Sequence, residues 1–226
     1  MFTNLPMPEI DATIREIAYG IDTLGADGVA FFTNYDGRYL GDPAYLPVFE
    51  EINRREAVVF VHPISPRNAN KIFGISESTL DYPLETTRAI VSLLYAGVPE
   101  LFPQIRFIFT HGGGAVPYLA GRIATFSELN PDFRQRGFSR VIPALQRFYY
   151  DITQSVNPYT FAALRTLVSD NQLLFGSDIP FARQQQIDFT LSELPTIGLS
   201  ESALANVKSA NAMRLFPGLA ARSHRS

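Results

Sequence analysis

Three side chains that could bind a metal ion or transfer protons stand directly after apolar, β-rich segments of the sequence. His62 lies in F-V-H-P, His111 opens H-G-G-G, and Asp178 lies in F-G-S-D-I-P. Imidazole nitrogens and carboxylate oxygens are the donors that zinc and other first-row divalent ions take in proteins. If the preceding segments are neighbouring strands of one sheet, these side chains meet at one edge and form a metal site.

Each histidine taken alone could be an ordinary structural residue. The shared position of His62 and His111 after separate apolar segments, with Asp178 after a third, favours a functional site instead. The sequence has three histidines, and the last, His224, lies in a polar tail where we expect no role.

Two other chemistries fit the sequence less well. The run Gly112–Gly114 could let a backbone approach a phosphate, but no Lys-Ser/Thr pair follows it and no G-x-G-x-x-G is present. Ser177 precedes Asp178 without the G-x-S-x-G turn that a serine nucleophile of a hydrolase requires. We therefore predict neither a nucleotide-binding site nor a serine hydrolase.

Strands alternate with helices along the chain. Nearly continuous apolar runs predict five strands buried on both faces, at Gly28–Thr33, Ala57–Val61, Ile105–Thr110, Phe148–Ile152 and Gln172–Gly176. Helical spacing of apolar residues appears in the segments between and after them, at Asp11–Leu24, Asp42–Glu56, Glu85–Tyr95, Val116–Phe126, Pro158–Val168 and Leu191–Leu215. Such alternation predicts a parallel sheet of the α/β class.

Polar residues end all five predicted strands, at Thr33-Asn34, His62, His111, Asp151 and Asp178. A (β/α)₈ barrel of the TIM type places its chemistry at this end of every strand, whereas an open doubly wound sheet uses one switch point. The pattern therefore favours a barrel, although five strands are fewer than the eight that close one.

Composition excludes several classes of protein. The 226 residues carry a net charge of −3 and include no cysteine, which excludes disulfides, thiolate metal sites and cysteine nucleophiles. We expect no nucleic-acid partner and no membrane partner, because there is no basic excess and no apolar run of membrane-spanning length. Without a secretory signal in these residues, the expected location is cytoplasmic.

The chain is predicted to be one domain over residues 1–219, followed by a disordered tail at 220–226. The segment Pro63–Tyr82 has no clear periodicity and is predicted to be a long loop, of the kind that is often functional.

Several motifs in a fixed order resemble the amidohydrolase-related family typified by aminocarboxymuconate-semialdehyde, γ-resorcylate and 6-methylsalicylate decarboxylases. They are G-A-D-G-V, V-F-V-H-P, E-T-T-R-A-I, F-I-F-T-H-G-G-G with L-A-G-R-I after it, F-G-S-D-I-P and N-A-M-R-L-F. The resemblance extends from about Pro8 to Pro217. It implies a TIM-type barrel and a metal-dependent decarboxylase of a small aromatic or dienoic carboxylic acid.

The resemblance implies a role for each site residue. His62 and Asp178 would ligate the metal, Zn²⁺ or another divalent ion such as Mn²⁺. His111 and Asp178 would be catalytic and would move protons. Arg122 would bind the substrate carboxylate, in some relatives across a homodimer interface, and Phe181 would line an aromatic pocket. The alternatives are a surface charge for Arg122 and ordinary packing for Phe181.

One feature departs from the family pattern. Relatives carry two more metal ligands, H-x-H or E-x-H, on their first strand, whereas this sequence has no histidine before His62. We therefore expect an incomplete barrel that comprises strands four to eight, inactive by itself. The open alternatives are a metal-dependent hydrolase of a lactone or an amide on the same scaffold, and a barrel fragment without catalytic activity.

Overall fold

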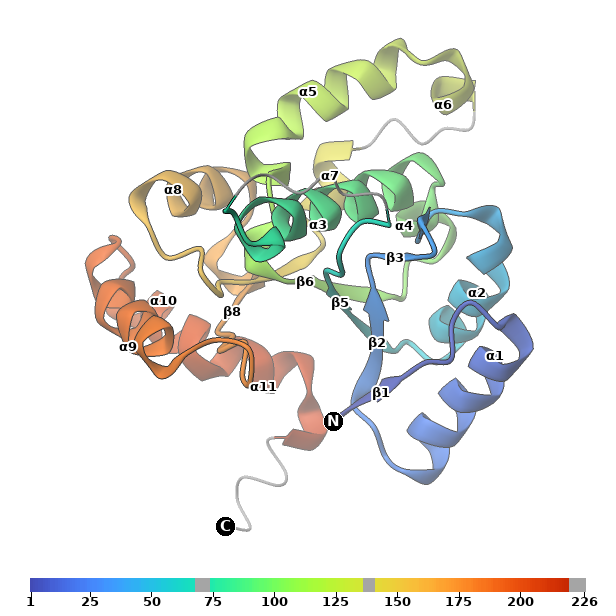
Figure 1. The fold of residues 1–226 in the computed structure, drawn as a ribbon, viewed down its shortest axis with the longest axis horizontal. Coiled ribbons are helices and arrows are strands. Elements are labelled where there is room, and N and C mark those ends of the chain that lie inside the picture. Colours follow the sequence, from blue (N-terminus) through green and yellow to red (C-terminus); the bar gives the residue numbers. More distant parts are fainter. Residues whose placement is uncertain (68–73, 136–140, 220–226) are drawn as a thin grey trace.

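The fold is an α/β arrangement in which helices surround a curved parallel sheet (Figure 1). The computed structural model describes residues 1–67, 74–135 and 141–219. The main sheet pairs its strands in the order β1-β2-β5-β6-β7-β8, every pair parallel. Their bounds are Phe2–Asn4, Gly28–Phe32, Val58–His62, Arg106–Phe109, Tyr149–Asp151 and Leu173–Leu174.

The prediction of five strands is wrong by one, because Phe2–Asn4 forms an additional strand, β1, beside β2. Phe2 pairs with Gly28 and Asn4 with Ala30. A three-residue strand with one large apolar side chain leaves no apolar run in the sequence, so only the pairing with β2 reveals it. The expected correspondence with strands four to eight alone is corrected accordingly, since the sheet has six strands.

Within the described residues, β1 and β8 are the two edges of this sheet, and no backbone pairing joins them. Side chains nevertheless connect the two chain ends. The Phe2 ring lies 5.6 Å from the ring of Phe216, just after α11 (Asn211–Leu215), and 5.4 Å from that of Phe60 on β5. Figure 1 shows α11 beside the N-terminus, at the gap between these edges.

The helices follow the predicted order, with the longer ones at Ile10–Ala18 (α1), Leu46–Arg54 (α2), Glu77–Tyr95 (α3), Val116–Leu129 (α5), Pro158–Leu167 (α8) and Gln184–Glu193 (α9). Shorter ones are Val98–Leu101 (α4), Pro131–Gln135 (α6), Val141–Leu145 (α7) and Glu201–Ala205 (α10). The segment after α10 continues through a π-helical turn, Asn206–Ala210, into α11.

The long loop predicted at Pro63–Tyr82 is shorter than expected, because α3 begins at Glu77. Ser76 caps this helix by accepting a hydrogen bond from the Ser78 amide. Pro83 within the helix obscures the helical pattern in the sequence. Residues 68–73 of the loop and the tail predicted to be disordered, 220–226, lie outside the described residues.

Two apolar clusters show to which face of the sheet the side chains of β5 point. Val59 and Val61 of β5 belong to the large core between the sheet and the helices, whereas Val58 belongs to a smaller cluster inside the curve of the sheet. Alternation then points His62, the last residue of β5, to the inner face as well. The curve of the sheet therefore turns the side chains at the strand ends toward a common centre.

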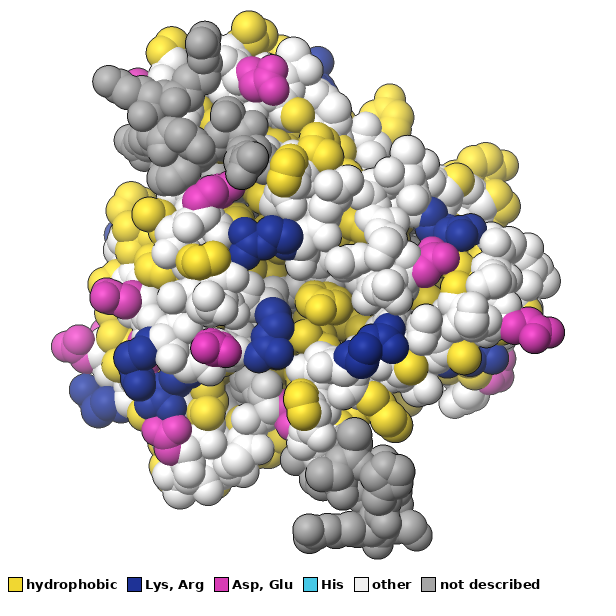
Figure 2. All heavy atoms as spheres, turned by 180° about the vertical axis from the view of Figure 1, so that it is seen from behind, with side chains coloured by type: hydrophobic (Ala, Val, Ile, Leu, Met, Phe, Trp, Pro, Cys, Tyr) yellow, Lys and Arg dark blue, Asp and Glu magenta, His cyan; other side chains and the backbone are white. Residues whose placement is uncertain are grey.

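No described helix is long and apolar enough to cross a membrane. The face shown in Figure 2 intersperses basic, acidic and apolar side chains and has no histidine in view.

Candidate active site

His62 presents its Nε2 atom to the centre of the site. Its Nδ1 lies 2.8 Å from the carbonyl oxygen of Pro63, an acceptor that requires a proton on Nδ1. Neutral imidazole with Nδ1–H leaves a lone pair on Nε2, the form that binds a metal ion. The Nε2 atom is 3.5 Å from Oδ1 of Asp178.

His111 begins a tight turn at the end of β6. Its φ is 55°, and Gly112, Gly113 and Gly114 that follow also have positive φ. A left-handed conformation at a residue other than glycine costs about 1–3 kcal/mol and is typical of functional sites. The Asp151 carboxylate offsets part of this cost, since Oδ1 accepts a 3.0 Å hydrogen bond from the His111 amide.

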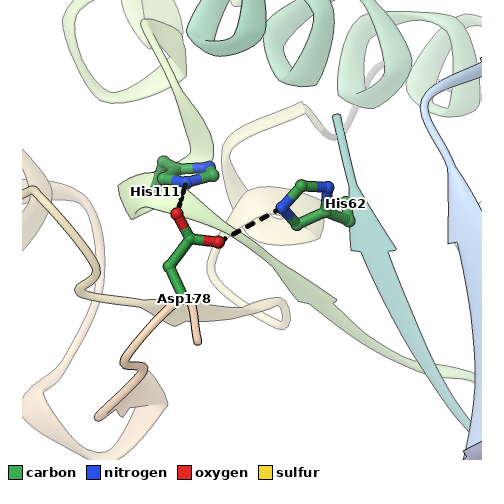
Figure 3. A group of neighbouring side chains, drawn as sticks. All are labelled: His62, His111 and Asp178. Atoms are coloured by element: carbon green, nitrogen blue, oxygen red, sulfur yellow. Dashed lines mark ion pairs between the residues drawn. The ribbon is translucent and has the colours of Figure 1, made fainter. Parts of the chain in front are cut away.

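Asp178 completes the group from the segment after β8, also with a positive φ, 58°. One carboxylate oxygen faces His62, and the other lies 3.9 Å from Nε2 of His111 (Figure 3). The side chains of His62, His111 and Asp178 are 25%, 11% and 15% exposed. The sequence prediction that these three residues converge is thus borne out in the geometry.

The electrostatics of the site keep Asp178 ionised. The nearby imidazole of His111 is the main cause that lowers the pKa of Asp178, helped by His62 and opposed by burial. At Asp151 burial is the dominant cause and raises the pKa, in spite of the nearby His111 and of hydrogen bonds from the amides of His111 and Thr153. Asp178 therefore offers an anionic carboxylate at neutral pH beside two imidazoles.

The donor set suits a divalent metal ion. One ligand atom from each of the three residues lies within 4.8 Å of the others. The His62–Asp178 and His111–Asp178 separations exceed normal hydrogen-bond length, so the lone pairs face a shared space that a proton or a cation would fill. Metal–ligand distances near 2 Å fit this space after a small contraction.

Two cavities of different character meet at the three residues. One, about 1060 Å³, lies toward α3 and has a mixed lining, in which Glu77, Asp81 and Gln154 stand beside apolar side chains. The other, about 700 Å³, lies inside the curve of the sheet, where Phe2, Phe60 and Phe175 contribute to a largely apolar lining. The second cavity therefore places an apolar space directly beside the three polar side chains.

Phe181 and Arg122 occupy different positions. Phe181 lines both cavities, and its ring lies 6.3 Å from that of His62, although 80% of the residue is exposed. Arg122 is exposed on α5, where its guanidinium group stacks 4.6 Å above the ring of Phe126. It lines neither of these cavities, so a single chain does not bring it to His111.

Asp151 and Gln154 contact the site residues but had no role predicted from the sequence. Asp151 stood out only as a polar residue at a strand end. Gln154 gave no signal, and its side-chain amide donates to Oδ2 of Asp178 at 3.4 Å.

A family model and a named relative both match nearly the whole chain. The amidohydrolase family model matches residues 1–218. A relative named 6-methylsalicylic acid decarboxylase, from Penicillium expansum, is 37% identical over 222 residues. The match covers 96% of this chain and 68% of that protein, so the chain spans about two thirds of the relative's length.

Solved structures show the same fold. A crystal structure described as an amidohydrolase II is 26% identical, with a TM-score of 0.87 over 96% of this chain and 70% of the other. A dihydroxybenzoic acid decarboxylase from Polaromonas, solved with manganese and 2-nitroresorcinol, is 19% identical with a TM-score of 0.80, covering 96% and 68% of the respective chains. The match of the family model over nearly the whole chain, supported by these relatives, shows that the chain belongs to the amidohydrolase family.

Proposed function

We propose that the site of this chain belongs to a metal-dependent decarboxylase for a small aromatic carboxylic acid of the 6-methylsalicylate or resorcylate type. Membership of the family and the similarity to named decarboxylases make it an enzyme of the carboxy-lyase type. The observation that carries the proposal is the convergence of His62, His111 and Asp178 above an apolar cavity. A cytoplasmic location remains a prediction.

His62 and Asp178 would hold the metal, either Zn²⁺ or Mn²⁺, and the manganese in the Polaromonas structure supports the second. A bound divalent ion supplies positive charge that orients the substrate's carboxylate and phenolate. His62 suits this role because its Nε2 carries the free lone pair.

Loss of CO₂ from a hydroxybenzoate requires a proton on the ring carbon that bears the carboxylate. His111 and Asp178 are the groups placed to move that proton. Because the pKa of Asp178 is lowered, its carboxylate is ionised at neutral pH, which favours His111 as the donor and Asp178 as the carboxylate that pairs with it. The apolar cavity would receive the ring and exclude water, with Phe181 at its entrance.

A substrate-binding role for Arg122 requires a second copy of the chain. Arg122 is exposed on α5 beside the exposed side chains of Tyr118, Phe126 and Leu129. We propose a homodimer in which this face of one protomer approaches the cavity of its partner. Light scattering should give a dimer, and mixing His111→Ala with Arg122→Ala versions of the active chimera described below should restore activity in a fraction of the mixed dimers.

The ionised Asp178 also favours a second candidate. The Asp178 carboxylate could act as general base toward a water molecule, and a divalent ion held by His62 and Asp178 would supply positive charge, so the same residues could hydrolyse a lactone or an amide. The two functions differ in product, which is CO₂ for the decarboxylase and a ring-opened or deaminated acid for the hydrolase.

The test is CO₂ release from hydroxybenzoates with added Zn²⁺ or Mn²⁺. We expect little activity from the 226-residue chain alone, since a catalytic zinc usually has three or more protein ligands and His111 is a poor third. A chimera that places the N-terminal third of the Penicillium relative before Met1 should release CO₂, whereas the same chimera with Asp178→Asn should not.

The outcomes separate the candidates. An active 226-residue chain would refute the expected weakness of the metal site. An inactive chimera that binds metal but cleaves lactones would favour the hydrolase. A chimera that neither binds metal nor turns over any substrate would leave the non-catalytic interpretation.

A further inference from the structure

Residues 151–155, which join β7 to α8, lie between the two turns that carry His111 and Asp178. The carboxylate of Asp151 is 6% exposed, and its Oδ1 accepts hydrogen bonds of 3.0 Å from the amides of both His111 and Thr153. One buried oxygen therefore joins the left-handed turn at His111 to this segment.

The same segment packs closely against a glycine in each turn. A Cβ atom placed on Gly112 would lie 2.9 Å from Oγ of Ser155. A Cβ atom placed on Gly176, two residues before Asp178, would lie 2.5 Å from Oγ1 of Thr153. Both turns therefore lie against the segment with no space for a side chain, which limits how far either can move.

The segment also reaches the Asp178 side chain directly. Nε2 of Gln154 donates to Oδ2, the carboxylate oxygen that faces His111. Gln154 has a φ of 54°, so three of the non-glycine residues with positive φ, His111, Gln154 and Asp178, meet at this point. Such strain persists only where the surrounding contacts hold it.

We propose that Asp151 and Gln154 are positioning residues, which set the separation and orientation of His111 and Asp178 for metal binding. Asp151 acts on the His111 backbone, and Gln154 selects the orientation of the Asp178 carboxylate. The inference rests on the proposed metal site, and it extends that site to a segment with no metal-binding residue of its own.

The first experiment measures Mn²⁺ affinity of the full chain by the electron paramagnetic resonance signal of free Mn²⁺. Gln154→Ala and the isosteric Gln154→Glu both remove the donor to Asp178. Gln154→Ala should weaken Mn²⁺ binding by about tenfold, in the range found for groups that orient metal ligands. Gln184→Ala is the matched control, because Gln184 donates to the carboxylate of Asp188 on the exposed side of α9.

The positioning role of Asp151 is tested by comparing a substitution that keeps an oxygen acceptor with one that removes it. Asp151→Asn keeps an oxygen acceptor for the His111 amide and should retain affinity within about twofold, whereas Asp151→Ala should lose at least as much as Gln154→Ala. Rescue by asparagine is the readout that a purely structural charge would not give. If Asp151→Ala does not fold, Asp151→Asn together with Gln154→Ala still decides the proposal.

Crystal structures of the variants provide a readout without metal. Gln154→Ala should release the Asp178 carboxylate from its present orientation, and Gln154→Glu should turn it away by repulsion. Wild-type Mn²⁺ affinity in Gln154→Ala would overturn the proposal. If the wild-type chain binds no Mn²⁺, the metal site itself fails, and an unchanged Asp178 orientation in both Gln154 variants would then overturn the positioning role.

Discussion

The two ends of the sheet are built differently. At the carboxyl ends of the strands, His62, His111 and Asp178 face one another at 3.5 Å and more. At the amino ends, Arg55 donates to Glu51 at 2.6 Å and also pairs with Asp22. At the carboxyl ends, the side chains of the three site residues lie close but form no hydrogen bonds with one another. At the amino ends, Arg55 forms short ion pairs with its partners.

Backbone conformation shows the same contrast, whereas buried polar atoms without a hydrogen-bond partner occur at both ends. Among the described residues, four of the five non-glycine positions with positive φ lie toward the carboxyl ends, at Asp36, His111, Gln154 and Asp178, and one lies at the amino end, at Glu56. Nδ1 of His111 is buried without a hydrogen-bond partner in the structure. At the amino end, Arg147 donates to the carbonyls of Pro99 and Pro103, whereas Oε2 of Glu100 between them is buried without a hydrogen-bond partner. The comparison teaches that this barrel keeps its chemistry at one end and its stabilising contacts at the other.

The largest effect should follow loss of a site residue. In the active chimera, Asp178→Asn should reduce CO₂ release by about 10³-fold or more, because it removes a ligand charge and a proton-transfer group. The melting temperature should stay the same or fall slightly, since the lowered pKa of Asp178 means that its charge contributes modestly to folded-state stability at neutral pH. Steady-state kinetics and calorimetry check both. A variant that melts far below the wild type would show that Asp178 stabilises the fold and would break the contrast between the two ends.

His111→Ala should cost several orders of magnitude in turnover by removing the proton donor, while Mn²⁺ affinity should fall less than in His62→Ala. Comparing turnover with Mn²⁺ binding in the two variants measures this difference. Equal losses of affinity would assign His111 as a full metal ligand.

Glu85 sharpens the comparison, because it is a well-satisfied group near the carboxyl end. It is 1% exposed, and its carboxylate accepts 2.7 Å hydrogen bonds from Asn34 and Tyr39 of the β3–β4 hairpin (Asn34–Tyr35 and Arg38–Tyr39). Glu85→Ala leaves two donors without their acceptor and should lower the free energy of unfolding by about 1–3 kcal/mol. Urea denaturation measures the loss. Glu85→Gln, which keeps one acceptor, should lose less, and equal losses would contradict the hydrogen-bond explanation.

The ion pairs of Glu51, at the amino ends of the strands, should make the stability of the fold depend on pH in acid. Hydrogen bonds from Arg54 lower the pKa of Glu51 from 4.5 to about 2, with further help from Arg55. Because the folded pKa is below the unfolded one, this contribution to stability is present above pH 4.5 and is lost as the pH falls toward 2. Thermal melts across that window should show less acid sensitivity in Glu51→Gln than in the wild type. An unchanged profile would mean that the ion pairs contribute nothing measurable.

The smallest effect should come from Arg54. Its side chain is 63% exposed, so its ion pair with Glu51 is screened by solvent. Arg54→Ala should change the free energy of unfolding by less than about 0.5 kcal/mol, and the difference should disappear in high salt. Arg55→Ala should cost more, since that side chain is 11% exposed and contacts two carboxylates. Denaturation of both variants at low and high salt tests the order.

The sequence by itself determined the identity and the common placement of the central site residues. Strand alternation is a local property, so a polar residue directly after an apolar run predicts a side chain at a strand end. This reasoning located His62, His111 and Asp178, and the parallel order of the strands brought them together. It missed β1, because Phe2–Asn4 becomes a strand only by pairing with β2.

Tertiary structure alone decided the contacts that join distant segments. The Asp151–His111 bond spans 40 residues of sequence and the Gln154–Asp178 bond spans 24, so neither leaves a periodic signal. That Arg122 lines neither cavity depends likewise on how α5 packs against its neighbours, whereas its stacking on Phe126, four residues along the same helix, is a local contact. Local patterns fix which residues reach the end of the sheet, whereas packing between turns fixes their separation, and metal chemistry depends on that separation.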